Sequence, residues 1–132
     1  MKFCPGQCRY LLAVYELCRE KSLVRSVDVA KYLSVTRPSV SRMLKCMANM
    51  ELIASDYSTN IVLTELGMDT AKSLHSKYTV IKCFFMNILK IPEKDASEQS
   101  IIFLVNFPED TIEKLSKITK NTMNKRRNHK TY

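Results

Sequence analysis

The segment spanning residues 36–49 constrains the fold most strongly, because it reads as a helix with two unlike faces. Thr36 is suited to cap its N-terminus, and Pro38 falls in the first turn, where the missing proline amide has no helical partner to lose. On a wheel of about 100° per residue, the apolar side chains share one arc of about 100°. They are Val40, Met43, Leu44 and Met47. The opposite arc carries small, polar and cationic side chains, namely Pro38, Ser41, Arg42, Lys45 and Asn49.

The flanking segments predict the architecture around this helix. Apolar spacing of three and four predicts a first helix from about Gln7 to Glu20. A short second helix follows Ser26, which we expect to be its N-cap, and ends in a tight connection at 33–35. After Leu52, residues 53–57 and 60–64 suit a two-stranded hairpin with a polar tip. This order predicts a mainly α fold that begins with a winged helix-turn-helix.

The second half of the chain predicts a helical domain. Thr64 can cap a long helix from Glu65 to about Leu89, whose apolar positions repeat by three and four and require a partner helix. They are Ala71, Leu74, Tyr78, Ile81, Phe85 and Ile88. Further helices are expected over residues 93–106 and from Pro108 onward. We therefore predict a DNA-binding domain at 1–66, a helical dimerisation domain at 67–119 and a flexible basic tail at 120–132.

The charge of +8 is unevenly distributed. Residues 1–64 contain nine Lys or Arg against five Asp or Glu, residues 65–113 contain five against eight, and residues 114–132 contain seven cations without an acid. Basic regions attract polyanions, nucleic acid first and acidic membranes second, although a solvated surface would show the same charge.

Other features exclude whole classes of protein. The apolar run at 101–105 is too short to span a bilayer, and residues 1–20 show no signal peptide, so we expect a cytoplasmic protein with its five cysteines reduced. The histidines, His75 and His129, form no visible pairing with a nucleophile, and no phosphate-binding loop is present. We expect neither an enzyme nor a bound cofactor.

The third helix instead suits double-stranded DNA. A major groove admits a helix whose exposed face is small and cationic, and arginine offers a forked donor to guanine or phosphate. Candidate base contacts are Arg37, Pro38, Ser39, Ser41 and Arg42. Candidate phosphate contacts are Ser26, Thr36, Lys45 and the wing residues Tyr57, Ser58, Thr59 and Asn60. A merely solvated amphipathic helix is the alternative.

The stretch Val35 to Lys45, followed by Leu52-Ile53, resembles the recognition helix of the DtxR/MntR metal-dependent repressors. Resemblance extends to the first helix at 10–17, to the wing strand and linking helix at 62–71, and to the closing helix at 109–115, so it covers roughly residues 9–118. The helix-turn-helix part alone would also admit MarR-like regulators. The resemblance implies a homodimeric repressor, joined through its helical domain, in which each winged helix reads a half-site.

The resemblance fails at the family's manganese and iron ligands. The expected acid pair falls on Arg9 and Leu12, and the expected histidine falls on Tyr78. The remaining three ligands fall on Ile101, Leu104 and Val105 or, with the alignment shifted by one, on Ser100, Phe103 and Leu104. These side chains offer no carboxylate or imidazole, so we predict a regulator that manganese and iron do not control and that has no metal site.

Three alternatives stay open from the sequence. Cys4 and Cys8, with His75 and Cys83 on the linking helix, could form a thiolate metal or redox site, although Cys18 and Cys83 read as small core residues. A small molecule could act as effector in the filled pocket. The winged helix could also be a protein-interaction module, but the basic third helix and basic C-terminal segment argue for DNA.

Overall fold

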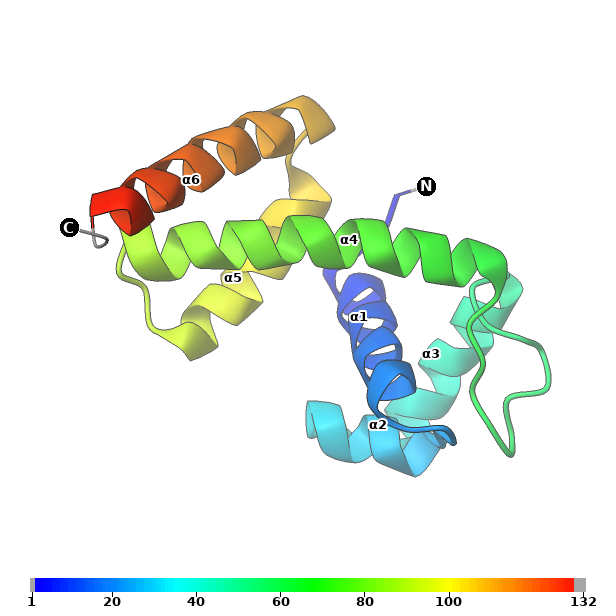
Figure 1. Ribbon diagram of the computed structural model, residues 1–132. Coiled ribbons are helices and arrows are strands. Elements are labelled where there is room, and N and C mark those ends of the chain that lie inside the picture. Colours follow the sequence, from blue (N-terminus) through cyan, green and yellow to red (C-terminus); the bar gives the residue numbers. More distant parts are fainter. Residues whose placement is uncertain (1, 130–132) are drawn as a thin grey trace. The chain divides into compact units, whose positions relative to one another are not determined.

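The computed structural model describes residues 2–129, with the side chain of His129 excluded, and the described chain is mainly α-helical. Figure 1 shows the helices in order: α1 (Pro5–Glu20), α2 (Ser26–Leu33), α3 (Arg37–Asn49), α4 (Glu65–Cys83), the π-helical turn η1 (Phe84–Ile88), α5 (Glu93–Asn106) and α6 (Glu109–His129). The chain forms two compact units that divide within α4, between Leu74 and His75. Our sequence-based division lay at the start of this helix, and its assignment of a dimerisation domain stays a prediction.

The first unit is built around α1 and α3. In α1, Leu11 and Val14 are completely buried. The predicted apolar face of α3 is confirmed, since Val40, Leu44 and Met47 are buried. Each such side chain contributes about 1.5–3 kcal/mol of hydrophobic free energy when fully buried. This burial fixes which face of α3 is left for solvent.

The connection between α2 and α3 is as tight as predicted. Ser34 adopts a left-handed conformation with φ of 55°, and the amide of Val35 donates to the carbonyl of Ala30 at 3.0 Å. A residue in the left-handed conformation commonly ends a helix, and glycine is the usual residue there. Ser34 takes this position at the end of α2. The start of α2 differs from our prediction, because Arg25 rather than Ser26 is the N-cap. The amide of Arg25 donates to the Asp28 carboxylate at 2.8 Å, so the acid three residues later accepts from the amide of the N-cap residue.

The wing contains less regular structure than predicted. Between α3 and α4 the described chain forms one isolated antiparallel bridge, Ile53 with Leu63, and no extended strand (Figure 1). The amide of Ala54 donates to the carbonyl of Val62 at 2.9 Å. Beyond that pair, the amide of Ile61 donates to the carbonyl of Val24 at 2.8 Å. The predicted two-stranded hairpin is therefore short because one of its edges pairs with the α1–α2 connection.

The second unit is held by aromatic and aliphatic packing. The helix predicted to reach Leu89 ends in η1, where the amide of Leu89 donates to the carbonyl of Phe84 at 3.2 Å. Phe85 meets Phe103 edge to face with ring centroids 5.9 Å apart, and Phe103 stacks on Phe107 at 4.0 Å. Such contacts add about 0.5–1.5 kcal/mol each beyond their buried area.

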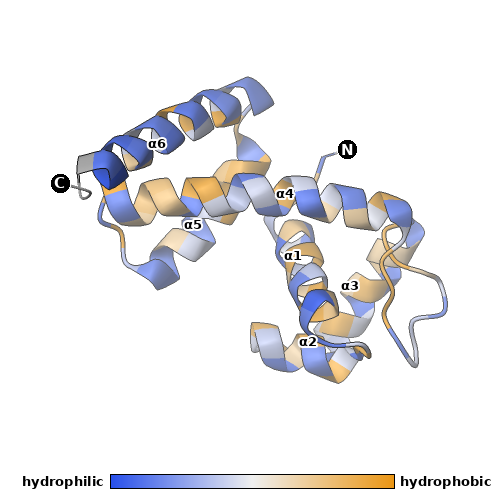
Figure 2. Ribbon diagram, in the orientation of Figure 1, coloured by the Kyte–Doolittle hydropathy of each residue, from blue (hydrophilic) through white to orange (hydrophobic). Residues whose placement is uncertain are grey.

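The C-terminal segment differs from the predicted flexible tail. α6 continues to His129, and Figure 2 shows its hydrophilic colouring toward that end. Thr119 is buried in the middle of the helix, and its hydroxyl donates to the carbonyl of Leu115 at 2.7 Å. Arg126 donates to the carbonyl of Asn87 at 3.0 Å. The buried residue here is a threonine, and the exposed Arg126 bonds to a backbone carbonyl, so apolar periodicity alone does not indicate the full length of α6. Residues 130–132 of the predicted tail lie outside the described residues.

The junction of α3, the wing and α4 depends on close backbone packing. The Thr64 hydroxyl accepts a hydrogen bond from the amide of Gly67 at 2.9 Å. The same hydroxyl donates to the carbonyl of Glu51 at 2.6 Å. A Cβ atom on Gly67 would lie 1.9 Å from the carbonyl oxygen of Leu52. Glycine is required at this position because a backbone atom occupies the space of any side chain.

We predict that Gly67→Ala lowers the free energy of unfolding by about 1–3 kcal/mol, because the backbone must shift to admit the methyl group. Gly6→Ala is the matched control, since its Cβ would lie 3.8 Å from the flexible Met43 side chain. Alanine is the better helix former by about 0.5–1 kcal/mol, so the control should be neutral or stabilising. Urea unfolding of both variants measures the difference. Equal stability of the two variants would contradict the close approach.

Candidate nucleic-acid interface

One face of α3 is exposed and cationic. Opposite the buried Val40 and Leu44, five of the predicted contact residues are exposed on this helix, namely Arg37, Pro38, Ser41, Arg42 and Lys45. Ser39 is half-buried beside them. The structure therefore brings together the small residues and the cations that the sequence placed on this face. Small side chains allow a close approach of the helix backbone, and the cations suit a polyanion.

Hydrogen bonds organise the beginning of α3. Thr36 is its N-cap, as predicted, and the Thr36 hydroxyl accepts from the amide of Ser39 at 3.3 Å and donates to the Ser39 hydroxyl at 2.9 Å. Arg42 in turn donates to the same Ser39 hydroxyl at 3.5 Å. Ser39 thus links the cap to the guanidinium and favours one direction of the arginine side chain. The N-terminus of a helix also carries partial positive charge, which favours nearby anions.

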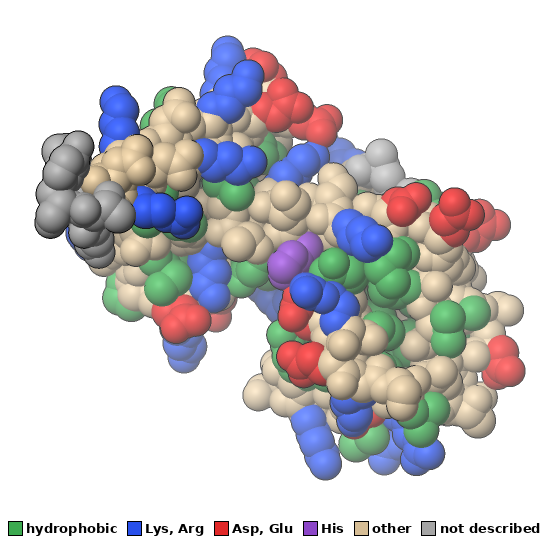
Figure 3. Space-filling model, in the orientation of Figure 1, with side chains coloured by type: hydrophobic (Ala, Val, Ile, Leu, Met, Phe, Trp, Pro, Cys, Tyr) green, Lys and Arg blue, Asp and Glu red, His purple; other side chains and the backbone are tan. Residues whose placement is uncertain are grey.

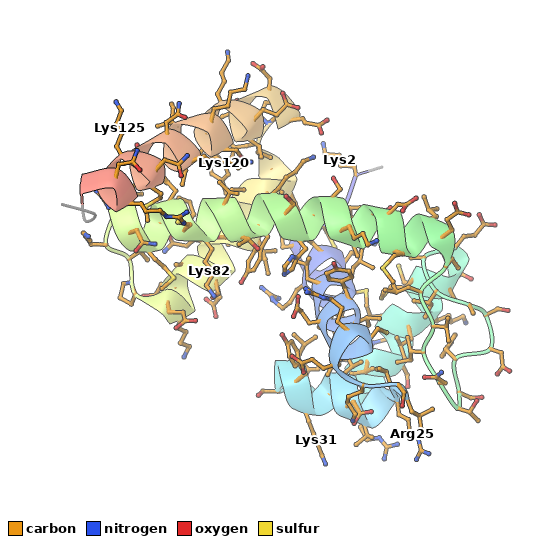
Figure 4. The ribbon with its side chains drawn as sticks, viewed as in Figure 1. Lys2, Arg25, Lys31, Lys82, Lys120 and Lys125 are labelled. Atoms are coloured by element: carbon orange, nitrogen blue, oxygen red, sulfur yellow. The ribbon has the colours of Figure 1, made fainter. Side chains whose placement is uncertain are left out.

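Two cations that our sequence reasoning did not select lie on the same unit. Arg25 and Lys31 are exposed at the N-terminal end and on the body of α2, and both extend from the lower edge in Figure 4. Figure 3 shows Lys and Arg side chains gathered along this edge. Arg25 directly precedes Ser26, so its position before a predicted helix was a usable signal. The neighbouring Asp28 pKa is lowered by a hydrogen bond from Lys21 and then by the amide of Arg25.

The wing residues separate into a tip and an anchor. Ser58 and Thr59 are exposed, and the Ser58 hydroxyl donates to the Asp56 carboxylate at 3.3 Å. Asn60, which we selected as a phosphate contact, instead uses its side-chain oxygen to accept from the amide of Val24 at 2.9 Å. Val24 is almost fully buried, so without this bond its amide would have neither water nor a protein group as a hydrogen-bond acceptor. No local pattern predicts this bond, because its two residues are 36 positions apart.

The residues matched to the family's metal ligands carry neither a carboxylate nor an imidazole. Leu12 and Leu104 are buried apolar side chains, each within its own unit. Under the shifted alignment, the buried Ser100 hydroxyl donates to the carbonyl of Ala96 at 2.6 Å, and Phe103 stacks with other rings. Manganese and iron are usually held by carboxylate and imidazole donors, so these positions offer them little affinity. Within residues 2–129, no group of three or more His, Cys, Asp or Glu side chains is arranged to hold a metal ion.

The cysteines are placed as structural rather than reactive thiols. Cys8 is fully buried, and burial raises its pKa to about 11, which disfavours the thiolate that metal binding and redox chemistry need. Cys4 is exposed, but its Sγ accepts from the amide of Gln7 at 3.5 Å and so caps α1. The Cys18 thiol donates to the carbonyl of Ile61 at 3.7 Å, and its pKa is raised by burial.

Helix, short helix, tight turn, cationic helix and wing define the fold of a winged helix-turn-helix protein. The family profile described as the iron dependent repressor, N-terminal DNA binding domain, matches residues 6–58. This match, together with the relatives below, supports a place for the chain among the DtxR/MntR-type winged helix-turn-helix regulators.

Individual relatives agree with this placement. The transcriptional regulator MntR of Escherichia coli is 31% identical over 84 residues, which are 64% of this chain and 54% of MntR. A helix-turn-helix-type transcriptional regulator of Methanocaldococcus jannaschii is 29% identical over 92 residues, covering 69% of this chain and 74% of its own length. The structure of the manganese regulator SloR has a TM-score of 0.78 at 27% identity and covers 89% of this chain.

The chain is shorter than several of these relatives. It spans 54% of the length of MntR from Escherichia coli and 55% of the SloR chain. Within residues 2–129, no helix combines the length and apolar character needed to cross a bilayer.

We predict that Asn60→Ala loosens the wing by leaving the buried amide of Val24 without its acceptor, at a cost of about 1–3 kcal/mol. Thr59→Ala, at the exposed neighbouring position, should have little effect on stability. Amide hydrogen exchange should accelerate at Val24 and Ile61 in the first variant alone. Unchanged exchange at both amides would show that the Asn60 bond does not hold the wing.

Proposed function

We propose that the chain is a sequence-specific, duplex-DNA-binding transcriptional regulator whose recognition element is α3. The observation that carries the proposal is the division of this helix into a buried apolar face and an exposed face of small and cationic residues. Family membership supports the same function. The cations Arg25 and Lys31 on α2 extend the positive surface and supply further phosphate contacts.

The residues that we propose to contact DNA divide into base contacts and phosphate contacts. We assign base contacts to Arg37, Pro38, Ser39, Ser41 and Arg42, and phosphate contacts to Ser26, Thr36, Lys45 and the wing tip. Because the Asn60 side-chain oxygen accepts from the amide of Val24, we assign Asn60 a second role, which is to position the wing. Arg42 is the residue best suited to base readout, since its guanidinium lies beside Ser39 and can donate two bonds to guanine.

We further propose that manganese and iron do not control this regulator. SloR is described as a manganese regulator, but the positions matched to the family's ligands in this chain carry Arg9, Leu12 and Tyr78, together with buried residues of α5. A metal shifts a conformational equilibrium only by binding one state better than another. Without donors, that difference in affinity is lost.

The second unit is proposed to join two copies of the chain. Leu89, Ile102 and Phe107 are 51%, 49% and 48% exposed there. These side chains are available to a partner, and a dimer that covered them would remove apolar surface from water. A homodimer would present two α3 helices to two DNA half-sites.

DNA readout gives the first functional prediction. Arg42→Ala should weaken binding to the preferred site by about 1–3 kcal/mol and relax preference at one base position. Lys45→Ala should weaken all sequences alike and lower the salt dependence by about one counterion. DNA selection with the wild type, followed by titration of specific and random duplexes, measures both. Equal losses on both duplexes for Arg42→Ala would make it a phosphate contact, and no wild-type DNA binding would favour protein docking instead.

Metal independence gives the second functional prediction. DNA affinity after exhaustive chelation should be unchanged when excess manganese or ferrous iron is added, because no donor set is present to couple metal to DNA binding. Fluorescence anisotropy with a labelled duplex measures this affinity under anaerobic conditions. A rise of about tenfold or more with either metal, equivalent to about 1.4 kcal/mol, would overturn the proposal. A rise with zinc alone that Cys4→Ser abolishes would establish the thiolate alternative.

A further inference from the structure

A groove in the second unit lies between α4 and α6 and is lined by hydrogen-bond donors. Its volume is about 260 Å³. Three lysines line it, Lys77 on α4 and Lys117 and Lys120 on α6, together with Ser76 and Ser116. Figure 3 shows Lys and Arg side chains in the strip between these helices, and Figure 4 places Lys120 on the α6 side of that strip.

Only one of the three lysines that line the groove has a carboxylate partner among the described residues. Lys77 is paired with Glu109 at 2.7 Å, and this contact lowers the pKa of the Glu109 carboxyl. Within the described part of the chain, neither Lys117 nor Lys120 has an ion-pair partner. No acid follows Glu113 in the sequence. Two adjacent turns of α6 therefore present cations that lack a partner carboxylate.

The floor of the groove is apolar. Val80 and the buried Ile112 contribute to it, and Glu113 lies at its edge. The ammonium and hydroxyl groups match the several acceptor oxygens of a phosphate, while the floor can contact carbon atoms. The carboxylate of Glu113 can accept from a hydroxyl group. A volume of about 260 Å³ lies below the range of about 300–1,000 Å³ that is usual for drug-sized ligands, so the ligand must be small.

We propose that this groove binds a small, hydroxyl-bearing phosphate ester through Lys117, Lys120 and Ser116. The site goes beyond DNA recognition and does not depend on it, since all its residues belong to the second unit. The phosphate lies between the two ammonium groups, its ester carbons lie over Val80 and Ile112, and its hydroxyl donates to Glu113.

Calorimetric titration of the full chain tests the proposal with glycerol 1-phosphate as the probe. Glycerol and ionic-strength-matched potassium chloride are the ligand controls. We expect saturable binding of the ester, and a loss of affinity of about tenfold or more in the double variant Lys117→Gln/Lys120→Gln, because charge-assisted bonds to phosphate are lost. Lys125→Gln/Arg126→Gln, which likewise removes two positive charges from exposed positions on α6 outside the groove lining, should bind like the wild type, as should Lys125→Gln alone. Circular dichroism confirms that each variant is folded.

Ser116→Ala separates local contacts from charge alone, because it removes a hydroxyl and leaves every lysine in place. We expect weaker binding of the ester by this variant. Absence of saturable binding by the wild type, or equal losses in Lys117→Gln/Lys120→Gln and Lys125→Gln/Arg126→Gln, would overturn the proposal. A different outcome would also overturn the proposal: the wild type does not bind the ester but binds anionic vesicles or random duplex, and Lys117→Gln/Lys120→Gln loses that binding. The lysines would then serve a lipid surface or nucleic acid.

Discussion

Burial of one side of α3 is the constraint on which the first unit depends. Val40, Leu44 and Met47 are enclosed, so the helix cannot rotate about its axis without exposing apolar surface. A slip of that kind would cost about 1.5–3 kcal/mol for each large side chain moved into water. The direction of Arg37, Ser41 and Arg42 toward solvent follows from this packing rather than from any attraction among them. The surface that we propose to contact DNA is the side of the helix that does not pack into the core.

Backbone contacts then place the elements around α3. The wing is joined to the α1–α2 connection through Val24, whose carbonyl accepts from Ile61 and whose amide donates to Asn60. At the other end of the wing, Gly67 brings the first turn of α4 against the carbonyl of Leu52. Regular strand pairing contributes little, because the described wing has a single bridge. A few directional bonds therefore position a loop that a longer sheet would otherwise hold.

The second unit shows how packing can occupy positions that the resemblance assigns to chemistry. Phe103 takes part in an aromatic cluster, and the Ser100 hydroxyl is already committed to the carbonyl of Ala96. The Phe103 ring and the hydrogen-bonded Ser100 hydroxyl stabilise the helices by packing and hydrogen bonding, which need no metal ion. Among the described residues, Lys117 and Lys120 on α6 of the same unit have no ion-pair partner, so this unit presents charge at positions other than those that the resemblance assigns to metal ligands.

The sequence by itself determined the order of the helices, the amphipathic division of α3 and its N-cap, because helical periodicity and capping are local properties. It also placed Arg37, Arg42 and Lys45 on one surface. The tertiary structure decided that Arg25 rather than Ser26 is the N-cap of α2, where the Arg25 amide donates to the Asp28 carboxylate. It likewise decided that Asn60 holds Val24, because a bond across 36 positions leaves no periodic trace. α6 extends to His129 because Thr119 and Arg126 find partners that hydropathy alone does not reveal.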